Sequence, residues 1–289
     1  MPKVSIVIPT CNRPELLKRA LKSVTEQTYN DYEVIVIDDG QKERAHSIVS
    51  TFSSLPITYI QNEVSLGGGG ARNKGISTAQ GEYVAFLDDD DVWVPDKLEI
   101  QVMLLDGAGP EIGFVFSAVE NCYSDKSVIT EVDATVRDYS VIALTRFKGF
   151  LTSSLLVRKK VLDEVGGFDE TLPSHQDPDL IIRITRNYQG IGLTEPLVKM
   201  RMSDIDDHIG GNIYRKIEGR EHVLEKHKAL LAQHPDILAK HYFWLGLLYR
   251  DTKNYVLAKE NFKKSLYFSF SFRVVIHLLT STIFIWLQK

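Results

Sequence analysis

The chain has 289 residues, a length that allows one large domain or a domain with an appendage. Hydrophobic residues make up 44% of it and charged residues 25%, which is typical of a globular protein with a substantial core. The 34 Lys and Arg and the 38 Asp and Glu leave a formal net charge of −4, so nothing in the composition points to a nucleic-acid partner. Two cysteines are too few for a disulfide framework, and no signal peptide is recognised, so a cytoplasmic protein is expected.

Over the first hundred residues, short apolar runs alternate with segments of helical periodicity. The predicted strands are 4–8, 32–37, 57–60 and 83–87. The predicted helices cover 14–24, 45–52, a segment that follows the glycines at 67–70 and runs to 79, and a segment that begins at 95. Strict alternation of this kind predicts an α/β fold with a mainly parallel sheet and helices on both faces. Ligands bind such sheets beyond the carboxyl ends of the strands.

Beyond residue 110 the pattern is mixed, with predicted strands at 112–117 and 154–157 and a predicted helix at 159–165. From about residue 214 to the end the periodicity is helical without strand alternation. These changes predict a first domain over residues 1–213 and a helical region over residues 214–289.

Four consecutive acidic residues, Asp88 to Asp91, directly follow the predicted strand 83–87. Neighbouring like charges raise one another's pKa or need a counter-charge. Carboxylate oxygens are ligands that suit Mg²⁺ or Mn²⁺, which in turn commonly hold substrate phosphates. The alternative is a solvated acidic turn, and the run by itself does not separate the two.

Three further segments allow a structural or a functional interpretation. The glycines at 67–70 form either a flexible loop or a backbone that approaches a ligand closely, where Arg72 and the start of a helix attract phosphate. Asp38 and Asp39 form either a plain turn or a strand end whose carboxylate accepts the imino N–H of a pyrimidine base. Asp177 is either an acidic residue in the first turn of a helix or a general base.

Taken together, six segments resemble, in order, the motifs of the family 2 glycosyltransferases, which have the GT-A fold and invert the anomeric centre. They are VSIVIPTCNR at 4–13, VIVIDDG at 34–40, ARNKGI at 71–76, GEYVAFLDDDD at 81–91, VGGFDE at 165–170 and QDPDLIIR at 176–183. Six ordered motifs are far more specific than any single one. The resemblance covers residues 4 to about 200.

The resemblance implies a role for each matching residue. The implied nucleotide-sugar-binding set is Pro9, Thr10, Asp38, Asp39, Arg72, Asp88 and Asp89. Within it, Pro9 and Asp39 would hold the base, Arg72 would reach the nucleotide or its diphosphate, and Asp88 would face the ribose. Asp90 would bind Mn²⁺ or Mg²⁺ at the diphosphate, and Asp177 would deprotonate the acceptor hydroxyl.

Two departures from the family pattern and two uncertain residues remain. Ser65 stands where the family often has Asn, which puts a nucleotide contact there in doubt. Gln176 replaces the usual Glu before Asp177, which relieves Asp177 of like-charge repulsion. His208 is either a further metal ligand or a solvated loop histidine. Trp93 either shapes the sugar or acceptor pocket or packs in the core.

The implied activity is transfer of a sugar from a nucleotide-diphosphate donor, expected to be UDP-linked, to a hydroxyl of a saccharide or lipid-linked saccharide in surface polysaccharide or glycolipid synthesis. A nucleotidyltransferase is the first alternative, but the segment 9–14 lacks the glycines that such an enzyme places after its first strand. The second alternative is a catalytically inactive GT-A scaffold that binds partners through its helical tail.

The tail itself contains two features. Residues 241–265 resemble one tetratricopeptide-type helical pair, which cannot bury its own face and must pack on the catalytic domain, a second subunit or a membrane. Residues 266–287 are apolar but interrupted by Arg273 and His277, and the continuous stretch 278–287 is too short to span a bilayer. A final packing helix or a helix in the membrane interface is expected, with peripheral contact at the inner face of the plasma membrane and dimerisation as the two alternatives.

Overall fold

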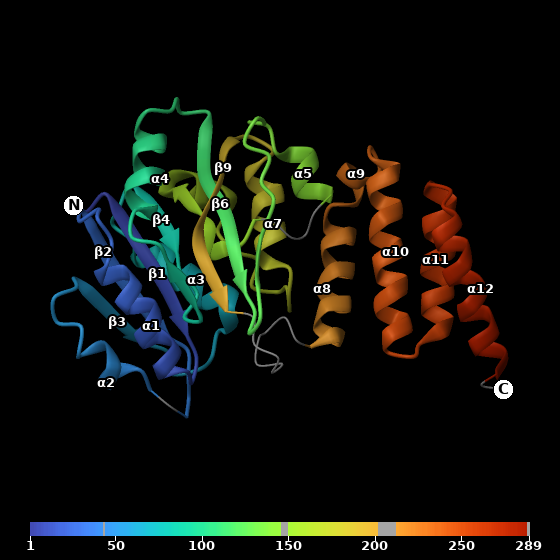
Figure 1. The fold of residues 1–289 in the computed structure, drawn as a ribbon, viewed down its shortest axis with the longest axis horizontal. Coiled ribbons are helices and arrows are strands. Elements are labelled where there is room, and N and C mark those ends of the chain that lie inside the picture. Colours follow the sequence, from blue (N-terminus) through green and yellow to red (C-terminus); the bar gives the residue numbers. More distant parts are fainter. Residues whose placement is uncertain (43, 146–149, 202–211, 288–289) are drawn as a thin grey trace. The chain divides into compact units, whose positions relative to one another are not determined.

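The computed structural model describes residues 1–42, 44–145, 150–201 and 212–287 (Figure 1). They form two compact units. The first contains the described residues of Met1–Thr171 and Gln176–Asp204, and the second contains Leu172–His175 and the described residues of Ile205–Lys289. The candidate site lies in the first unit.

The first unit is built on one mixed sheet, which contains nine strands among the described residues. The strands are β1 (Val4–Thr10), β2 (Tyr32–Asp38), β3 (Ile57–Gln61), β4 (Tyr83–Phe86), β5 (Asp91–Trp93), β6 (Ile112–Cys122), β7 (Ser127–Ile129), β8 (Leu156–Arg158) and β9 (Gln189–Arg201). Their order is β3-β2-β1-β4-β8-β6-β9-β5, and β7 pairs with β6. The strands β3, β2, β1 and β4 are parallel as predicted, whereas β8 runs antiparallel to both β4 and β6.

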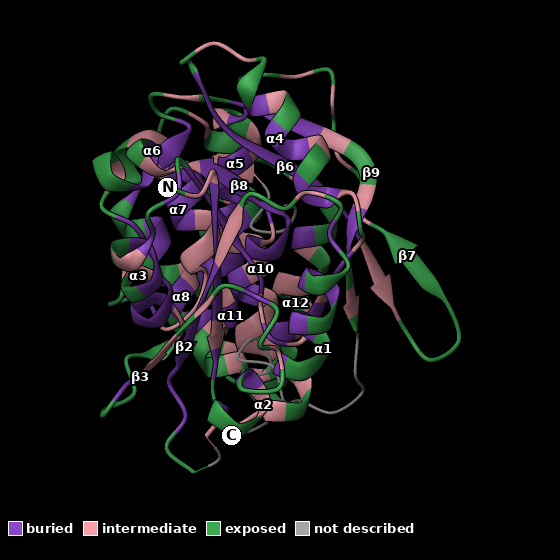
Figure 2. Cartoon of the chain, turned by 90° about the vertical axis from the view of Figure 1, so that its left-hand side faces the viewer, coloured by how far each residue is buried: buried purple, intermediate pink, exposed green. Residues whose placement is uncertain are grey.

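Helices cover the sheet on both faces. They are α1 (Pro14–Thr25), α2 (His46–Val49), α3 (Gly67–Thr78), α4 (Lys97–Asp106), α5 (Ser140–Thr145), α6 (Lys159–Val165) and α7 (Gln176–Ile184), together with the 3₁₀ helix η1 (Thr152–Ser154). Side chains alternate between the two faces of β1, so that Ile6 packs in a core with Leu21 of α1 and Leu98 of α4, while Val7 meets Gly75 of α3 on the other face. The central strands are therefore buried on both sides, and Figure 2 shows β6 and β8 largely in purple, whereas β7 is exposed.

This topology brings three strand ends to one edge. In the parallel register Thr10 pairs with Asp38, and Val7 pairs with Phe86, the last residue of β4. The amide of Asp39 donates to the carbonyl of Thr10 at 2.8 Å, which joins the ends of β1 and β2 directly. The polar residues after β1, β2 and β4 therefore lie together, as the alternating pattern predicts.

The second unit is helical in all of its elements that the structure describes. Its helices are α8 (Ile213–Lys226), α9 (Lys228–Leu231), α10 (Pro235–Asp251), α11 (Tyr255–Phe268) and α12 (Phe272–Leu287). The predicted helical pair corresponds to α10 and α11, which approach closely because Gly246 leaves room for the ring of Phe262. Val274 of α12 packs into the same small core as Phe262 and Ala258. None of the described helices combines the length and hydrophobicity that crossing a bilayer requires.

Candidate functional site

The turn after β2 uses Asp38 as an internal support. Its carboxylate is fully buried and accepts hydrogen bonds from the amides of Gly40 (3.0 Å) and Ala45 (2.8 Å) and from the hydroxyl of Tyr59 (2.5 Å). Buried carboxylates need such donors, because an unpaired buried charge is costly. These contacts hold the turn in place, and they favour a structural role for Asp38 over direct contact with a base.

Asp39 next to it is held by the segment that leads into α3. One oxygen accepts from the side-chain amide of Asn62 (2.9 Å) and the backbone amide of Leu66 (2.7 Å), and the other accepts from the hydroxyl of Ser65 (2.6 Å) and the amide of Gly67 (2.9 Å). A carboxylate offers about four acceptor positions. A nucleotide base that bonds to Asp39 would therefore have to replace one of these donors. One of them is Ser65, the residue that stands where the family often has Asn.

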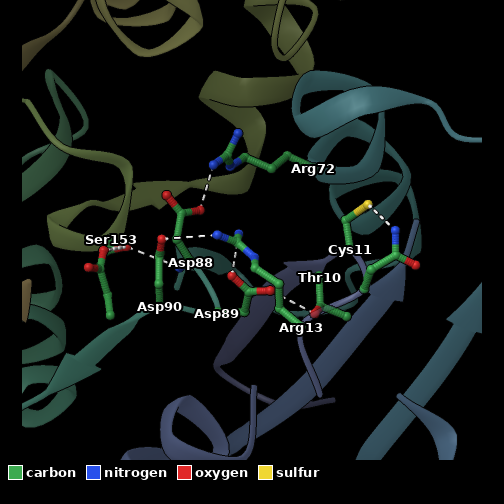
Figure 3. Close-up of polar contacts among 10 residues, drawn as sticks. Thr10, Cys11, Arg13, Arg72, Asp88, Asp89, Asp90 and Ser153 are labelled. Carbon is green, nitrogen blue, oxygen red and sulfur yellow. Dashed lines mark hydrogen bonds and ion pairs between the residues drawn. The ribbon is translucent and has the colours of Figure 1, made fainter. Parts of the chain in front are cut away.

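The second residue of the acidic run, Asp89, is buried, and Figure 3 shows its contacts with Thr10 and Arg13. It is only 1% exposed, it accepts a hydrogen bond from the hydroxyl of Thr10 at 2.7 Å, and it forms an ion pair with Arg13 at 2.6 Å. Burial raises the pKa of Asp89 to about 7, although Arg13 and Thr10 both act to lower it. Thr10 and Asp89 are thus both buried, and Asp89 connects the end of β1 to Arg13. Their predicted contact with a nucleotide sugar stays a prediction.

Arg13 was not among the predicted site residues. It stands at the start of α1, in the same motif as Thr10, and its guanidinium also reaches Asp90 at 3.3 Å. The only signal in the sequence was a cation five residues after the predicted strand 4–8. Its two carboxylate partners follow a different strand, 76 and more residues later in the chain, so the fold was needed to bring them together.

Arg72 of α3 reaches the first residue of the acidic run. It forms an ion pair with Asp88 at 2.5 Å, and its guanidinium lies over the ring of Phe168, 5.5 Å from the ring centre. The carboxylate attraction keeps the pKa of Arg72 above its usual value even though burial acts to lower it. Together Arg13 and Arg72 place two positive charges along the edge where the acidic run ends β4.

The 3₁₀ helix η1 contacts this run through Ser153. The hydroxyl of Ser153 accepts from the amide of Asp88 at 3.0 Å and donates to the carboxylate of Asp91 at 2.5 Å. Burial, together with Asp88 and Asp90, raises the pKa of Asp91 well above its usual value. Asp91 opens β5, so it belongs to the interior and not to the exposed part of the run.

Trp93 packs in the core, which decides between its two interpretations. It is buried in the same hydrophobic cluster as β1 and α1, and its indole N–H donates to the carbonyl of Ser153 at 2.8 Å. The ammonium of Lys97 lies 4.1 Å from the ring centre and donates to Gln101, which in turn donates to the carbonyl of Ser154. Burial lowers the pKa of Lys97 well below its ordinary value. This buried group holds η1 in place.

Asp177 lies in the first turn of α7, where the resemblance implies the general base. Burial raises its pKa, and the charge of Asp88 raises it further. Arg72 opposes that rise, as do the hydroxyl and the backbone amide of Thr152 in η1. Asp177 therefore lies within electrostatic reach of both members of the Arg72–Asp88 pair.

The glycine run at 67–70 explains how the start of α7 comes close to α3. Gly67 to Gly70 form the first turn of α3, so of the two interpretations of this run the flexible loop is excluded. A Cβ atom on Gly69 would stand 2.9 Å from the side-chain nitrogen of Gln176, the residue before Asp177. The absence of a side chain at Gly69 is what lets the start of α7 pack directly on α3.

A turn after α6 completes the cluster. Gly167 has a left-handed φ of 66°, and the next residue, Phe168, exchanges two hydrogen bonds with the side chain of Asn73 at 2.8 and 2.9 Å. Asn73 also donates to Glu170 at 2.7 Å. These contacts fix the ring of Phe168 against the guanidinium of Arg72. The segments 71–76 and 165–170 therefore together hold Arg72 in position.

A divalent ion fits the donors at this edge. The side chains of Asp88 and Asp90 are 30% and 19% exposed, which distinguishes them from buried Asp89. Across the described ranges no three His, Cys, Asp or Glu side chains form a metal-binding group, and His208 lies outside these ranges. A site with one or two carboxylates is the ordinary arrangement for Mg²⁺, because substrate phosphates and water supply its other ligands.

The mixed sheet has the GT-A fold, which solved glycosyltransferase structures share. The chain belongs to glycosyl transferase family 2, whose family model matches residues 5–165. The chain is 34% identical to the amylovoran biosynthesis glycosyltransferase AmsB of Erwinia amylovora over 209 residues, which cover 68% of this chain and 69% of AmsB.

Two solved structures share the fold at low sequence identity. TarS 1–349 of S. aureus in complex with UDP-GlcNAc has a TM-score of 0.63 and 16% identity, with 96% of this chain and 79% of that chain covered. The mannosyltransferase PcManGT of Pyrobaculum calidifontis, in complex with GDP-Man and Mn²⁺, has a TM-score of 0.62 and 19% identity, with 98% and 80% covered. Against the longer TarS chain, this chain spans half the length.

Proposed function

We propose that the protein transfers a sugar from a UDP-linked donor to a hydroxyl group of a saccharide acceptor and inverts the anomeric centre. One observation carries the proposal: Arg72 is ion-paired with Asp88 on the donor side and also acts on the pKa of Asp177. A group that would hold the diphosphate and a group that would take the acceptor's proton thus belong to one electrostatic cluster. Inverting transfer requires that proximity.

The donor side has the charges that a nucleotide diphosphate needs. Arg13 and Arg72 now pair with Asp88, Asp89 and Asp90, and an incoming diphosphate would compete for the guanidinium groups. Asp90, with Asp88 beside it, would hold Mn²⁺ or Mg²⁺, which when bound would neutralise charge on the diphosphate. Pro9 and Asp39, which lie at the ends of β1 and β2, remain the proposed contacts of the base.

The acceptor side depends on Asp177. In the proposed step the acceptor oxygen forms a bond to the anomeric carbon, the bond from that carbon to the diphosphate oxygen breaks, and the diphosphate leaves with the electron pair. The acceptor's proton passes to the carboxylate of Asp177. Because burial raises the pKa of Asp177, the carboxylate is a stronger base than an exposed one. A single attack opposite the leaving group inverts the centre, as in inverting glycoside hydrolysis.

The similar proteins support the substrate classes of this proposal. The TarS structure was solved with UDP-GlcNAc and PcManGT with GDP-Man and Mn²⁺, which favours a nucleotide-sugar donor and a divalent ion here. The name of AmsB places that protein in amylovoran biosynthesis, which favours a role in polysaccharide synthesis for this chain. Its acceptor would accordingly be a saccharide, either free or linked to a lipid.

The test compares the wild type with Asp177→Asn. The variant should bind UDP and UDP-sugars as the wild type does but lose about 10²- to 10⁴-fold in transfer rate, the usual contribution of a general base. Asp163→Asn serves as the control, because Asp163 is an exposed carboxylate on α6 that pairs with Lys159, outside the cluster. Donor binding is measured by calorimetry, and UDP release is measured with a panel of UDP-sugars and acceptors in the presence of Mn²⁺.

Two outcomes would count against the proposal. Near-normal turnover by Asp177→Asn would show that another group is the base. If the wild type binds UDP but transfers no sugar of the panel to any acceptor, the inactive scaffold becomes the better interpretation.

A further inference from the structure

The last helix, α12, presents an apolar stripe to the solvent. The stripe consists of large side chains that are each between 57% and 78% exposed: Phe272, Ile276, Leu279, Ile283, Trp286 and Leu287. Single exposed apolar residues are normal, but a continuous row over a whole helix marks a contact surface.

The stripe lies opposite the side on which α12 packs. An α-helix turns by about 100° per residue, so the six members of the stripe fall within an arc of about 100°. The residues of α12 that are buried, Val274 and Ser281, fall on the other side of the helix, and Val274 joins the core with Phe262. The stripe is therefore a second face, which the helical unit does not use for its own packing.

The end of the chain is also positively charged. Residues 261–289 contain Lys263, Lys264, Arg273 and Lys289 and no Asp or Glu, although the whole chain has a formal net charge of −4. Lys263, Lys264 and Arg273 are exposed, and Arg273 borders the stripe. Exposed Tyr267 and Phe270 precede the helix, and the ring of Phe270 lies 5.1 Å from that of Phe272, the first member of the stripe.

We propose that α12 docks on the surface of an anionic lipid bilayer. The helix would lie in the plane of the interface, with the stripe among the upper acyl chains and the basic side chains at the lipid phosphates. Trp286 and Tyr267 suit this place, because tryptophan and tyrosine concentrate at membrane interfaces. Where the proposed transfer uses a lipid-linked acceptor, this docking would bring the enzyme to the surface that carries it.

The charge pattern favours a membrane over a second copy of the chain. In a two-fold contact through α12, each residue faces the same surface of the partner. Such a contact would gather the basic residues of both copies with no acidic residue of this segment to balance them. Anionic lipid supplies the missing negative charge.

The test is sedimentation of the full chain with phosphatidylcholine vesicles that contain phosphatidylglycerol. The wild type should pellet with these vesicles and bind about tenfold less to pure phosphatidylcholine. The double variant Ile276→Asn with Ile283→Asn should bind the mixed vesicles at least about tenfold more weakly, because its two side chains no longer favour the acyl region. The control is Ile129→Asn with Val256→Asn, which also replaces two exposed aliphatic side chains by Asn, but outside α12, and should bind as the wild type does.

Several results would overturn the inference. The inference fails if the wild-type protein stays in the supernatant with both vesicle types. It also fails if the double variant pellets with the mixed vesicles as the wild type does. Light scattering that shows a dimer lost in the Ile276/Ile283 variant, without vesicle binding, would assign the stripe to a second copy. Thermal unfolding checks that the variants fold, and because the readout is sedimentation, failure here is separate from failure of the transfer reaction.

Discussion

Asp89→Asn tests the electrostatics of the site most sharply. Asp89 is 1% exposed, and its pKa stands at about 7 in place of the ordinary 3.8, despite its ion pair with Arg13. At 1.36 kcal/mol for each pH unit, keeping this carboxylate ionised inside the folded protein costs about 4 kcal/mol. Asparagine has nearly the same shape, keeps an oxygen for the hydroxyl of Thr10, and carries no charge.

The sign of the effect follows from the direction of the shift. Because the pKa of Asp89 is higher in the folded than in the unfolded state, its contribution to stability is fully present below about pH 4 and is lost as the pH rises to about 7. Near pH 4.5 the variant should therefore be more stable than the wild type by only about 1 kcal/mol. Near pH 8 the variant should be more stable, by up to about 4 kcal/mol.

The measurement is urea unfolding of both proteins across this pH range, with EDTA and without nucleotide. Other carboxylates titrate in both proteins, so their effect largely cancels in the difference. Asp163→Asn, at an exposed position, should show no such trend. A difference that does not change with pH, or a variant that is less stable near pH 8, would refute the assignment of Asp89 as a buried, electrostatically costly support.

Three further predictions concern neighbouring groups. Ser153→Ala should lower the free energy of unfolding by about 1–3 kcal/mol, because buried Asp91 loses its hydroxyl donor, and thermal unfolding that matches the wild type would contradict this. Gly167→Ala should lower the free energy of unfolding by about 1–3 kcal/mol, because φ is 66° and the new Cβ would collide with the side-chain oxygen of Asn73. The control is Gly107→Ala, at an ordinary φ of −80°. Equal losses of unfolding free energy in both variants would argue against strain at Gly167. Asp90→Ala should abolish Mn²⁺-dependent binding of UDP, and unchanged calorimetric binding would remove the proposed metal role.

The alternating strands and helices of the first hundred residues were predictable because their signal is local. Each strand that is buried on both faces reads as a short apolar run, and each helix shows a repeat of three to four residues. The parallel arrangement follows from that alternation, and with it the meeting of Thr10, Asp38 and Asp88 at one edge. The prediction was less complete after residue 110, where β8 and β9 pair with partners far along the chain.

The roles inside the acidic run could not be read from its four identical letters. Asp89 and Asp91 are buried, while Asp88 and Asp90 are partly exposed, because the chain leaves β4 in a turn and enters β5 at Asp91. The role of Trp93 could not be read from the sequence either, because its contact with Ser153 joins it to a segment 60 residues later in the chain.

The amino-acid sequence by itself thus determined the element types, the sheet edge that carries polar residues, and the motifs of glycosyl transferase family 2, because hydrophobic period and motif spacing are properties of the chain read in order. Only the tertiary structure decided which carboxylates of the acidic run are buried and which are exposed, and that Arg13 pairs with them. It also decided that Gly67 to Gly70 begin a helix on which α7 packs. These features depend on burial and on ion pairs between distant segments, and an unfolded chain contains neither.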